Sequence, residues 1–364
     1  MKRCACLLLL LSLLLSGCNS WLDGSYVSVV PHEEQNNQIE SQLQAVSSYS
    51  GLYRALKNMI RNGTESGLIS VENYNQLVVA RDMRLAAETI QVSDPFGAYA
   101  VQGIQFEVGT NAGKPAISVK IQYYHGRAEI NNIKTTEVMS EAETEIARAL
   151  DTCSSSLVLY IERYEERDLV QWVTDYATQY PHKVMELPQV SANLYPETGE
   201  QRIMELKFTY QTSREILRNM QSQVGRKFQD IGMRIRLAED GKKHTMLYTY
   251  LTEQFTEFRN EISITPAYML LTQGVGDSAA FATLFAAVYK QADIENYLVT
   301  GTRDGEPWHW NIILVDGVYY HVDILRSIRE GQFQIYTDAE LTGYSWDYSV
   351  YPACGVLPET PAEE

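Results

Sequence analysis

The sequence is short of cysteine and of positive charge, and both shortages exclude classes of function. Of 364 residues, 5 are Cys, and 30 Lys and Arg stand against 46 Asp and Glu, which gives a formal net charge of −16. An acidic chain with no basic block argues against binding to nucleic acid or to anionic lipid surfaces. The 6 His residues show no zinc-type spacing. Motifs for phosphate and dinucleotide binding are also missing, so we expect no metal and no cofactor.

Long apolar runs are also lacking beyond the N-terminus. After Cys18 the longest largely apolar stretch is residues 281–289, well below the roughly 20 residues of a membrane-spanning helix. The N-terminus itself has Lys2 and Arg3, then an apolar core over residues 7–15, then Ser16-Gly17-Cys18. This order is typical of a secretory signal.

A small-residue pair directly before a cysteine resembles the bacterial lipobox, in which that cysteine is acylated, for example with palmitate, and becomes the new N-terminus. We therefore expect Cys18 to anchor the chain in the lipid bilayer, on the extracytoplasmic face of the cell membrane. The alternative is an ordinary secretory signal with an incidental Cys18. Removing residues 1–17 takes two positive charges away, so the mature net charge is −16 − 2 = −18.

Composition and pattern divide the chain into several segments. We expect a signal peptide, a polar tether, two α+β units, a third α+β domain and a disordered tail, at residues 1–17, 18–42, 43–134, 135–212, 213–354 and 355–364. Cys153 and Cys354 are the cysteines left for the folded part. They could pair in an oxidising compartment, although two buried free thiols are the commoner outcome.

The two α+β units look like copies of one another. Glu72-x-Tyr74 parallels Glu162-x-Tyr164, and residues 117–124 parallel residues 203–210, so the period lies between 86 and 90 residues. Each copy predicts a strand, a helix and two further strands. Neither copy carries a polar cluster with catalytic spacing, and we interpret both as spacer domains, with ligand presentation as the alternative.

The third domain begins with two predicted helices, over residues 213–236 and 242–258, and then carries three motifs. These are Gly274-Val275-Gly276-Asp277-Ser278, Trp308-His309-Trp310-Asn311 and Tyr320-His321-Val322-Asp323. Between the last two, Asp316-Gly317 predicts a tight hairpin turn. Over about residues 210–330 the segment resembles the transglutaminase-like, papain-type hydrolase family. The family pattern has a Gly-Val-Cys that opens a helix, a His-x-Trp-Asn strand and a Tyr-His-Val-Asp strand.

The resemblance implies a papain-type α+β fold but not the chemistry of the family. In this alignment the nucleophile position is Gly276, the base position is Trp308, and Asp323 alone keeps its family identity. A cysteine hydrolase needs a thiolate, a base and an acid that orients the base. Ser278 could replace the nucleophile, but it lies two positions further along the helix, about 200° around the axis. We therefore expect an inactive domain.

His309 is the alternative base. Alternation along a strand places Trp308 and Trp310 on one face and His309 on the other. A β-bulge could return His309 to the site. That would allow an active hydrolase or acyl-transferase with an unrecognised nucleophile. Our preferred hypothesis is binding or scaffolding at the cell envelope, with a peptide or glycan ligand in a cleft near Trp308, Trp310 and Asp277. A structural module that binds nothing specific is the third alternative.

Overall fold

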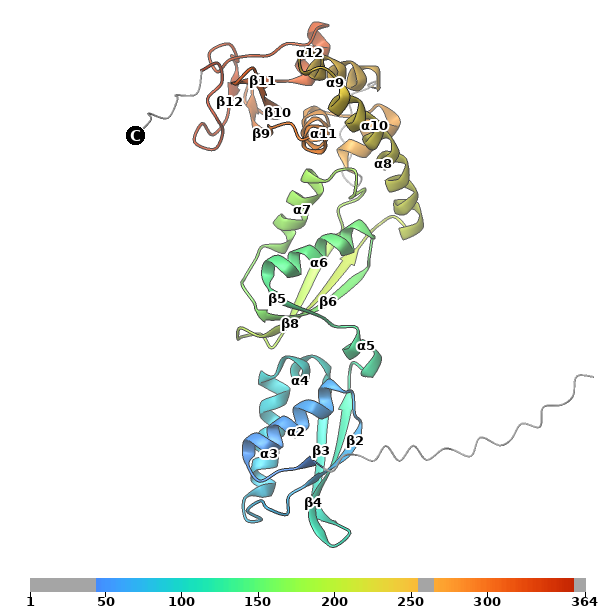
Figure 1. The fold of residues 1–364 in the computed structure, drawn as a ribbon, viewed down its shortest axis with the longest axis vertical. Helices are drawn as coiled ribbons and strands as arrows, with labels where there is room; N and C mark the ends of the chain where they lie inside the picture. The colour runs from blue at the N-terminus through green and yellow to red at the C-terminus, as the bar shows by residue number, and fades with distance from the viewer. Residues whose placement is uncertain (1–43, 255–264, 357–364) are drawn as a thin grey trace, which may run out of the picture.

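The computed structural model describes residues 44–254 and 265–356, and these form three units that follow one another along the long axis of the molecule (Figure 1). Each unit contains one four-stranded sheet. The predicted signal peptide, the tether with Cys18 and most of the predicted tail lie outside the described residues. Within the described part, none of the helices combines the length and the apolar character needed to cross a membrane.

The first unit packs helices against one face of a sheet with strand order β1-β2-β4-β3. Leu52, Leu56 and Ile60 recur at helical spacing and are fully buried between α2 and the sheet. The elements are β1 (Gln44–Ala45), α2 (Tyr49–Arg61), β2 (Ser66–Ser70), α3 (Val79–Ser93), α4 (Pro95–Ala100), β3 (Val101–Asn111) and β4 (Lys114–Tyr123).

The second unit repeats this order after the short helix α5 (Arg127–Asn131). Its sheet has the order β5-β6-β8-β7, the counterpart of the first. The elements are β5 (Lys134–Val138), α6 (Met139–Asp151), β6 (Ser156–Arg163), α7 (Leu169–Gln179), β7 (Gln189–Tyr195) and β8 (Arg202–Thr209). The fold is thus α+β, as predicted, and the predicted strand, helix, strand and strand of each copy are present. Each copy also begins with a strand and a helix that the sequence reasoning missed.

The register of the strands corrects one detail of the predicted repeat. Ile69 of β2 pairs with Ile117, whereas Leu159 of β6 pairs with Met204. Since Ile69 and Leu159 are 90 residues apart, Ile117 corresponds to Met204 and not to Ile203. The alignment of the last strands was therefore one residue out, which would exchange the two faces of a strand.

The two units meet where α4 packs on the outer face of the second sheet. Phe96 of α4 lies 5.2 Å from the ring of Tyr160, and Tyr99 lies 5.4 Å from the ring of Tyr195. The guanidinium of Arg61 stacks over Phe96 at 4.6 Å. Aromatic contacts of this kind stabilise the joint beyond the apolar area they bury.

The third unit places a sheet of order β11-β10-β9-β12, antiparallel throughout, between a helical layer and the C-terminal segment (Figure 1). On one face, Phe281 and Phe285 of α11 share a core cluster with Ile313. On the other face, Trp310 packs with Trp346. The elements are α8 (Arg214–Leu237), α9 (Asp240–Gln254), α10 (Pro266–Gln273), α11 (Ser278–Gln291), β9 (Asn296–Arg303), β10 (Glu306–Val315), β11 (Val318–Val322), α12 (Ile324–Glu330) and β12 (Tyr344–Ser345).

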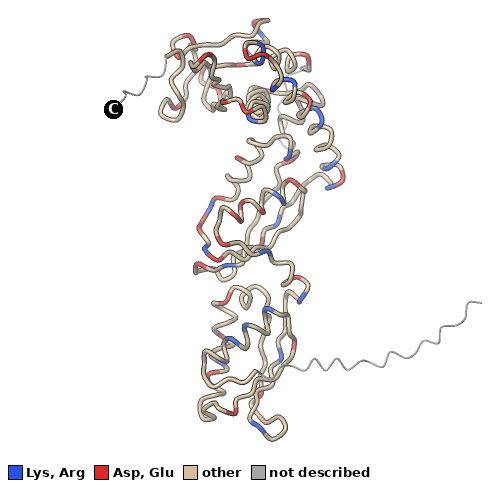
Figure 2. Tube along the Cα trace, in the orientation of Figure 1, with Lys and Arg blue, Asp and Glu red and all other residues tan. Residues whose placement is uncertain are grey.

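Several smaller predictions can be checked in the same structure. Asp316 and Gly317 both have positive φ, 50° and 79°, as a tight turn between β10 and β11 requires. Cys153 and Cys354 are free, buried thiols. The end of the second predicted helix, beyond residue 254, lies outside the described residues. Acidic and basic side chains are interspersed along all three units (Figure 2), so neither sign of charge is confined to one of them.

Candidate functional site

The start of α11 is fixed by a helix cap. The carboxylate of Asp277 accepts a hydrogen bond from the backbone N–H of Ala280 at 2.9 Å, so Asp277 is the N-cap and Ser278 the first helical residue. The hydroxyl of Ser278 accepts a hydrogen bond from the backbone N–H of His309 at 3.3 Å. Ser278 is 6% exposed. The residue of this helix start that faces β10 is therefore Ser278.

Gly276 does not occupy that place. A Cβ on Gly276 would lie 2.9 Å from the Cβ of Ala280 and 3.5 Å from the side chain of Leu270. A side chain there would point between α10 and α11, away from β10. A side chain at Gly276, the expected nucleophile position, would thus lie against Ala280 and Leu270, whereas the hydroxyl of Ser278 contacts the backbone of β10.

Trp308 is hydrogen-bonded directly to Asp323. The indole Nε1–H of Trp308 donates to Oδ2 of Asp323 at 2.7 Å, and the hydroxyl of Tyr344 donates to the same oxygen at 2.6 Å. The other oxygen, Oδ1, accepts the backbone N–H of Arg326 at 2.9 Å and caps α12. Asp323 is 1% exposed. Both of its oxygens are used, so the carboxylate holds an indole, a helix start and a phenol together.

Two guanidinium groups flank the indole of Trp308. Arg303 lies 5.2 Å and Arg329 lies 5.7 Å from the centre of its ring. Arg303 also stacks over Tyr344 at 5.4 Å, and its Nη1 is 3.8 Å from Oδ2 of Asp323. Burial raises the pKa of the Tyr344 phenol, and the negative charge of Asp323 and its hydrogen bond with the phenol raise it further. The partly exposed part of this cluster is a cationic and aromatic surface.

His309 lies on the opposite face of β10, as alternation predicted. Its neighbour on that face, Asn311, donates to the carbonyl of Ala282 in α11 at 2.9 Å. Burial lowers the pKa of His309, and the nearby carboxylate of Asp277 opposes this shift. The residue pairing of β10 with β9 and β11 continues without a register shift from Glu306 to Val315. The bulge that would have turned His309 toward Asp323 is thus contradicted, because a bulge would shift this register.

Trp310 corrects another site prediction. It is 1% exposed, and its Nε1–H donates to Nδ1 of His321 at 2.9 Å. A buried side chain of this kind lines no ligand cleft, so of the three predicted cleft residues Trp308 and Asp277 alone reach solvent in part. Trp310 belongs instead to the core between the sheet and the C-terminal segment.

A cluster that sequence reasoning missed lies behind Trp310. Ligand atoms of His321, Asp338 and Cys354 lie within 4.8 Å of one another. The three residues are far apart in sequence and have no motif spacing, so only the fold brings them together. The signal that could have indicated the cluster was the buried polar residue that alternation places at His321.

The hydrogen bonds of this cluster argue against metal binding and against catalysis. Because an indole can only donate, Nδ1 of His321 must accept, and the ring proton is then on Nε2, which donates to Oδ1 of Asp338 at 2.8 Å. Neither nitrogen keeps a free lone pair for a metal ion or for the thiol proton of Cys354. Burial, with Asp338 beside it, raises the pKa of Cys354 to about 12, so the sulfur stays an unreactive thiol.

Comparison with known proteins adds little to these observations. No protein-family model matches the chain, and no curated protein is similar to it. Among solved structures, one described as "Crystal structure of a TGase" is similar at 10% identity and a TM-score of 0.25, over 63% of this chain and 66% of that chain. The chain thus spans just under two thirds of that structure. A likeness of this size is a hint of a transglutaminase-like fold and carries no argument about activity.

Proposed function

We propose that this is a lipid-anchored protein of the cell envelope whose third unit is a transglutaminase-like domain without catalysis, acting in binding or scaffolding. The observation that carries the proposal is the bond from Trp308 to Asp323 at 2.7 Å. In the family that the motifs resemble, a histidine would make this bond and accept a proton at its other nitrogen. An indole has one N–H and no basic nitrogen, so it cannot act as a base.

The nucleophile position supports the same conclusion. The hydroxyl of Ser278 accepts the N–H of His309 and has no imidazole partner among the described residues. A serine hydroxyl is a weak nucleophile unless a base removes its proton. With serine and tryptophan in place of cysteine and histidine, Asp323 is left with a structural task as helix cap and hydrogen-bond acceptor.

A binding role is supported by the surface around Trp308. The guanidinium groups of Arg303 and Arg329 lie beside an indole that is partly exposed, in a protein whose net charge is strongly negative. Arginine next to an aromatic ring recognises carboxylates and planar groups well. A peptide or glycan that carries a carboxylate is the ligand class that this surface suits.

Restoring the missing groups tests the assignment of the site. In the double variant Ser278→Cys, Trp308→His we expect the new thiol to be alkylated by iodoacetamide about tenfold faster near neutral pH than in Ser278→Cys alone, because an imidazolium lowers a thiol pKa. Gly276→Cys, Trp308→His is the matched control and should show no such gain. Faster alkylation of Gly276→Cys, Trp308→His than of Ser278→Cys, Trp308→His would instead assign the nucleophile position to Gly276.

The natural protein should show no enzymatic activity of the transglutaminase or protease type. We expect no hydrolysis and no crosslinking of peptide substrates, and no labelling of the third unit by thiol-directed active-site probes. The competing function, an active hydrolase or acyl-transferase, depends on His309, which lies half-buried beside Ser278. Turnover that His309→Ala abolishes would establish that competitor and end the present proposal.

The lipid anchor has its own test. Cys18→Ala should move the protein from the membrane fraction to the soluble fraction, because acylation needs the thiol and a lipid chain supplies the membrane affinity. Cys6→Ala, which changes a cysteine of the same predicted signal peptide, is the matched control and should leave the protein in the membrane fraction. Membrane retention of the Cys18→Ala protein would contradict lipidation.

A further inference from the structure

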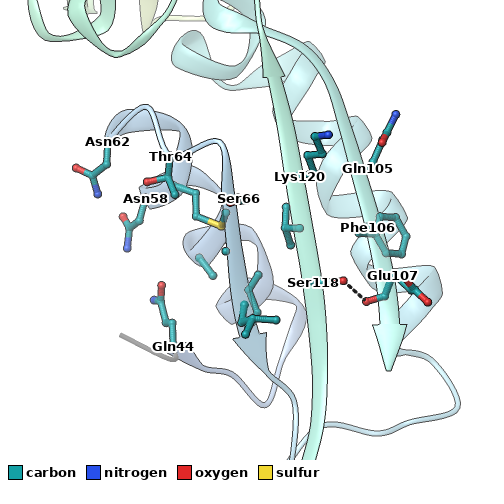
Figure 3. Close-up of a pocket in the computed structure, with 16 residues that line it drawn as sticks. Gln44, Asn58, Asn62, Thr64, Ser66, Gln105, Phe106, Glu107, Ser118 and Lys120 are labelled. Atoms are coloured by element: carbon teal, nitrogen blue, oxygen red, sulfur yellow. Dashed lines mark hydrogen bonds between the residues drawn. The ribbon is translucent and has the colours of Figure 1, made fainter. Parts of the chain in front are cut away.

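A groove occurs twice in the molecule, once in each repeated unit. In the first unit it has a volume of about 1040 Å³ and runs along β2 beside α2 (Figure 3). In the second unit it has a volume of about 530 Å³ and runs along β6 beside α6. Nine lining residues of the first groove have a counterpart 90 positions later in the second: Gln44, Ala55, Asn58, Met59, Asn62, Thr64, Ser66, Gly67 and Leu68.

The second groove is closed by polypeptide from the preceding unit. Tyr99, His125, Glu129 and Asn132 complete its lining, and all four precede β5 in the chain. His125 stacks on Tyr99 with ring centres 4.1 Å apart. One wall of this groove is therefore formed by protein from outside the second unit.

The first groove differs from the second at the residues that fill it. In the second groove, Glu145 forms ion pairs with Lys134 and Arg148. The corresponding residues of the first groove are Ala55, Gln44 and Asn58, so one ion-paired cluster is replaced by two amides and a methyl group. Leu157 of the second groove corresponds to Gly67, which widens the first. The first groove is thus wider and has lost those charges.

The amide side chains of the first groove have unused hydrogen-bonding groups. Within the described part of the chain, the side-chain amides of Gln44, Asn58 and Asn62 have no hydrogen-bond partner in the structure, and all three are exposed. Figure 3 shows them together on the α2 side of β2, with Gln105, Glu107 and Lys120 on the side of β3 and β4. An amide offers donors and an acceptor together, which matches the N–H and C=O of another main chain.

The spacing of these amides fits an extended polypeptide. Asn58 and Asn62 are four residues apart in a helix and its C-cap, which separates them by about 6 Å along the axis. Alternate residues of an extended chain are about 6.6 Å apart. Beside them, β1 pairs with β2 at Ile69 and Ser70, so in the described structure residues 66–68 have no strand partner on that side. An open strand edge is a template for main-chain hydrogen bonds.

We propose that the groove of the first unit binds an extended, uncharged segment of a partner protein, mainly through main-chain hydrogen bonds to Asn58 and Asn62. The apolar side chains of Met59 and Leu68 also line this groove and accept an apolar side chain of the ligand. The site lies in the first unit, so it is independent of the function proposed for the third.

The test uses the mature protein and a panel of uncharged peptides, acetylated and amidated at their ends. The tightest binder of the panel is measured by titration calorimetry. Gly67→Leu and Asn58→Arg, which copy the second groove into the first, should each weaken binding about tenfold or more. Arg148→Asn and Leu157→Gly are the reciprocal controls and should leave binding unchanged. A version of the peptide N-methylated at alternate residues should lose binding, because it lacks main-chain donors.

Thermal unfolding of each variant checks that it is still folded. A Cβ at Gly67 would lie 2.9 Å from Cε of Met59, the end of a flexible side chain, so Gly67→Leu needs only a small adjustment. Equal binding by wild type, Gly67→Leu and Asn58→Arg would overturn the proposal, as would equal binding of the N-methylated peptide or no binding by any peptide of the panel. Binding of neutral oligosaccharides in place of peptides would assign the groove to a different class of ligand.

Discussion

Single residues decide the chemistry of the third unit, and Trp308 is the decisive one. Its indole N–H donates to Asp323, and the ring has no basic nitrogen, so this side chain cannot act as a base. The motif resemblance singled out both positions, and the structure shows that their side chains contact each other. It could not predict Ser278, because the residue that faces β10 depends on where the cap starts α11.

Trp308→Phe should destabilise the protein by about 1–3 kcal/mol, because it removes a donor from a buried carboxylate. The loss is measured by urea unfolding. Trp172→Phe is the matched control: Trp172 stacks on Tyr176 at 5.4 Å, and its indole N–H has no hydrogen-bond partner among the described residues. Equal losses in the two variants would show that the bond to Asp323 contributes little.

Histidines that are partly or fully buried make stability depend on pH. Burial lowers the pKa of His182 from 6.5 to about 4, and it also lowers the pKa of His244, His309 and His321. A lowered pKa means that the unfolded chain binds protons first as the pH falls. Stability is therefore full above about pH 6.5 and is lost below it, and His182 alone accounts for roughly 2 kcal/mol between pH 7 and pH 5.

His182→Gln checks this assignment. Unfolding free energies at pH 7 and pH 5 are compared for the wild type and the variant, and the variant should lose roughly 2 kcal/mol less over this interval. His182 stacks on Phe228 at 4.1 Å, so the variant is also expected to be less stable at both pH values. Only the change in unfolding free energy between pH 7 and pH 5 reports the protonation of His182. An unchanged difference would assign the pH dependence to other groups.

At the scale of elements, short-range signals predicted most helices and strands. The amphipathic pattern of residues 168–180 predicts a helix there, and α7 runs from Leu169 to Gln179 with Asp168 as its N-cap. The alternation in residues 308–313 gave the faces of β10 correctly, since Asn311 bonds to α11 and Trp310 packs on the other side. The first strand and helix of each repeat were missed. β1 spans two residues, and its pairing with β2 comes from the tertiary fold rather than from any local pattern.

Asp277→Ala tests the element that positions Ser278. Loss of the carboxylate that accepts the N–H of Ala280 should cost about 1 kcal/mol in thermal or urea unfolding. Asp277→Asn is the conservative control, because asparagine caps helices about as well, and it should cost only a few tenths of a kcal/mol. A similar loss in both variants would mean that the charge, rather than the cap, stabilises this end of α11.

In the whole molecule, the two repeated units contact each other through the second sheet and not through the first. The outer face of the second sheet presents Tyr160, which contacts α4 of the first unit, whereas the corresponding residue of the first sheet is Ser70. The small side chain of Ser70 offers no aromatic ring for such a contact. Among the described residues, the aromatic contact is therefore made at the second sheet and not at the first.

Tyr160→Ser should loosen this joint. We expect tryptic cleavage at the exposed Arg127, in the segment between the units, to become severalfold faster because the joint opens more often. Tyr348→Ser, at a residue 63% exposed in the third unit, is the control and should leave the rate unchanged. Equal rates for the two variants would show that the aromatic contact does not hold the units together.

Local patterns in the sequence were enough to predict the α+β class, the repeat and the faces of β10, and they also led to the expectation of a third unit without a catalytic histidine. These depend on patterns of neighbouring residues and on the identity of single side chains. The tertiary structure decided that Ser278 rather than Gly276 faces β10, that His321, Asp338 and Cys354 share a hydrogen-bonded cluster, and that one groove occurs twice with different linings. Each of these depends on which distant segments pack together, and packing is a property of the whole core rather than of any local pattern.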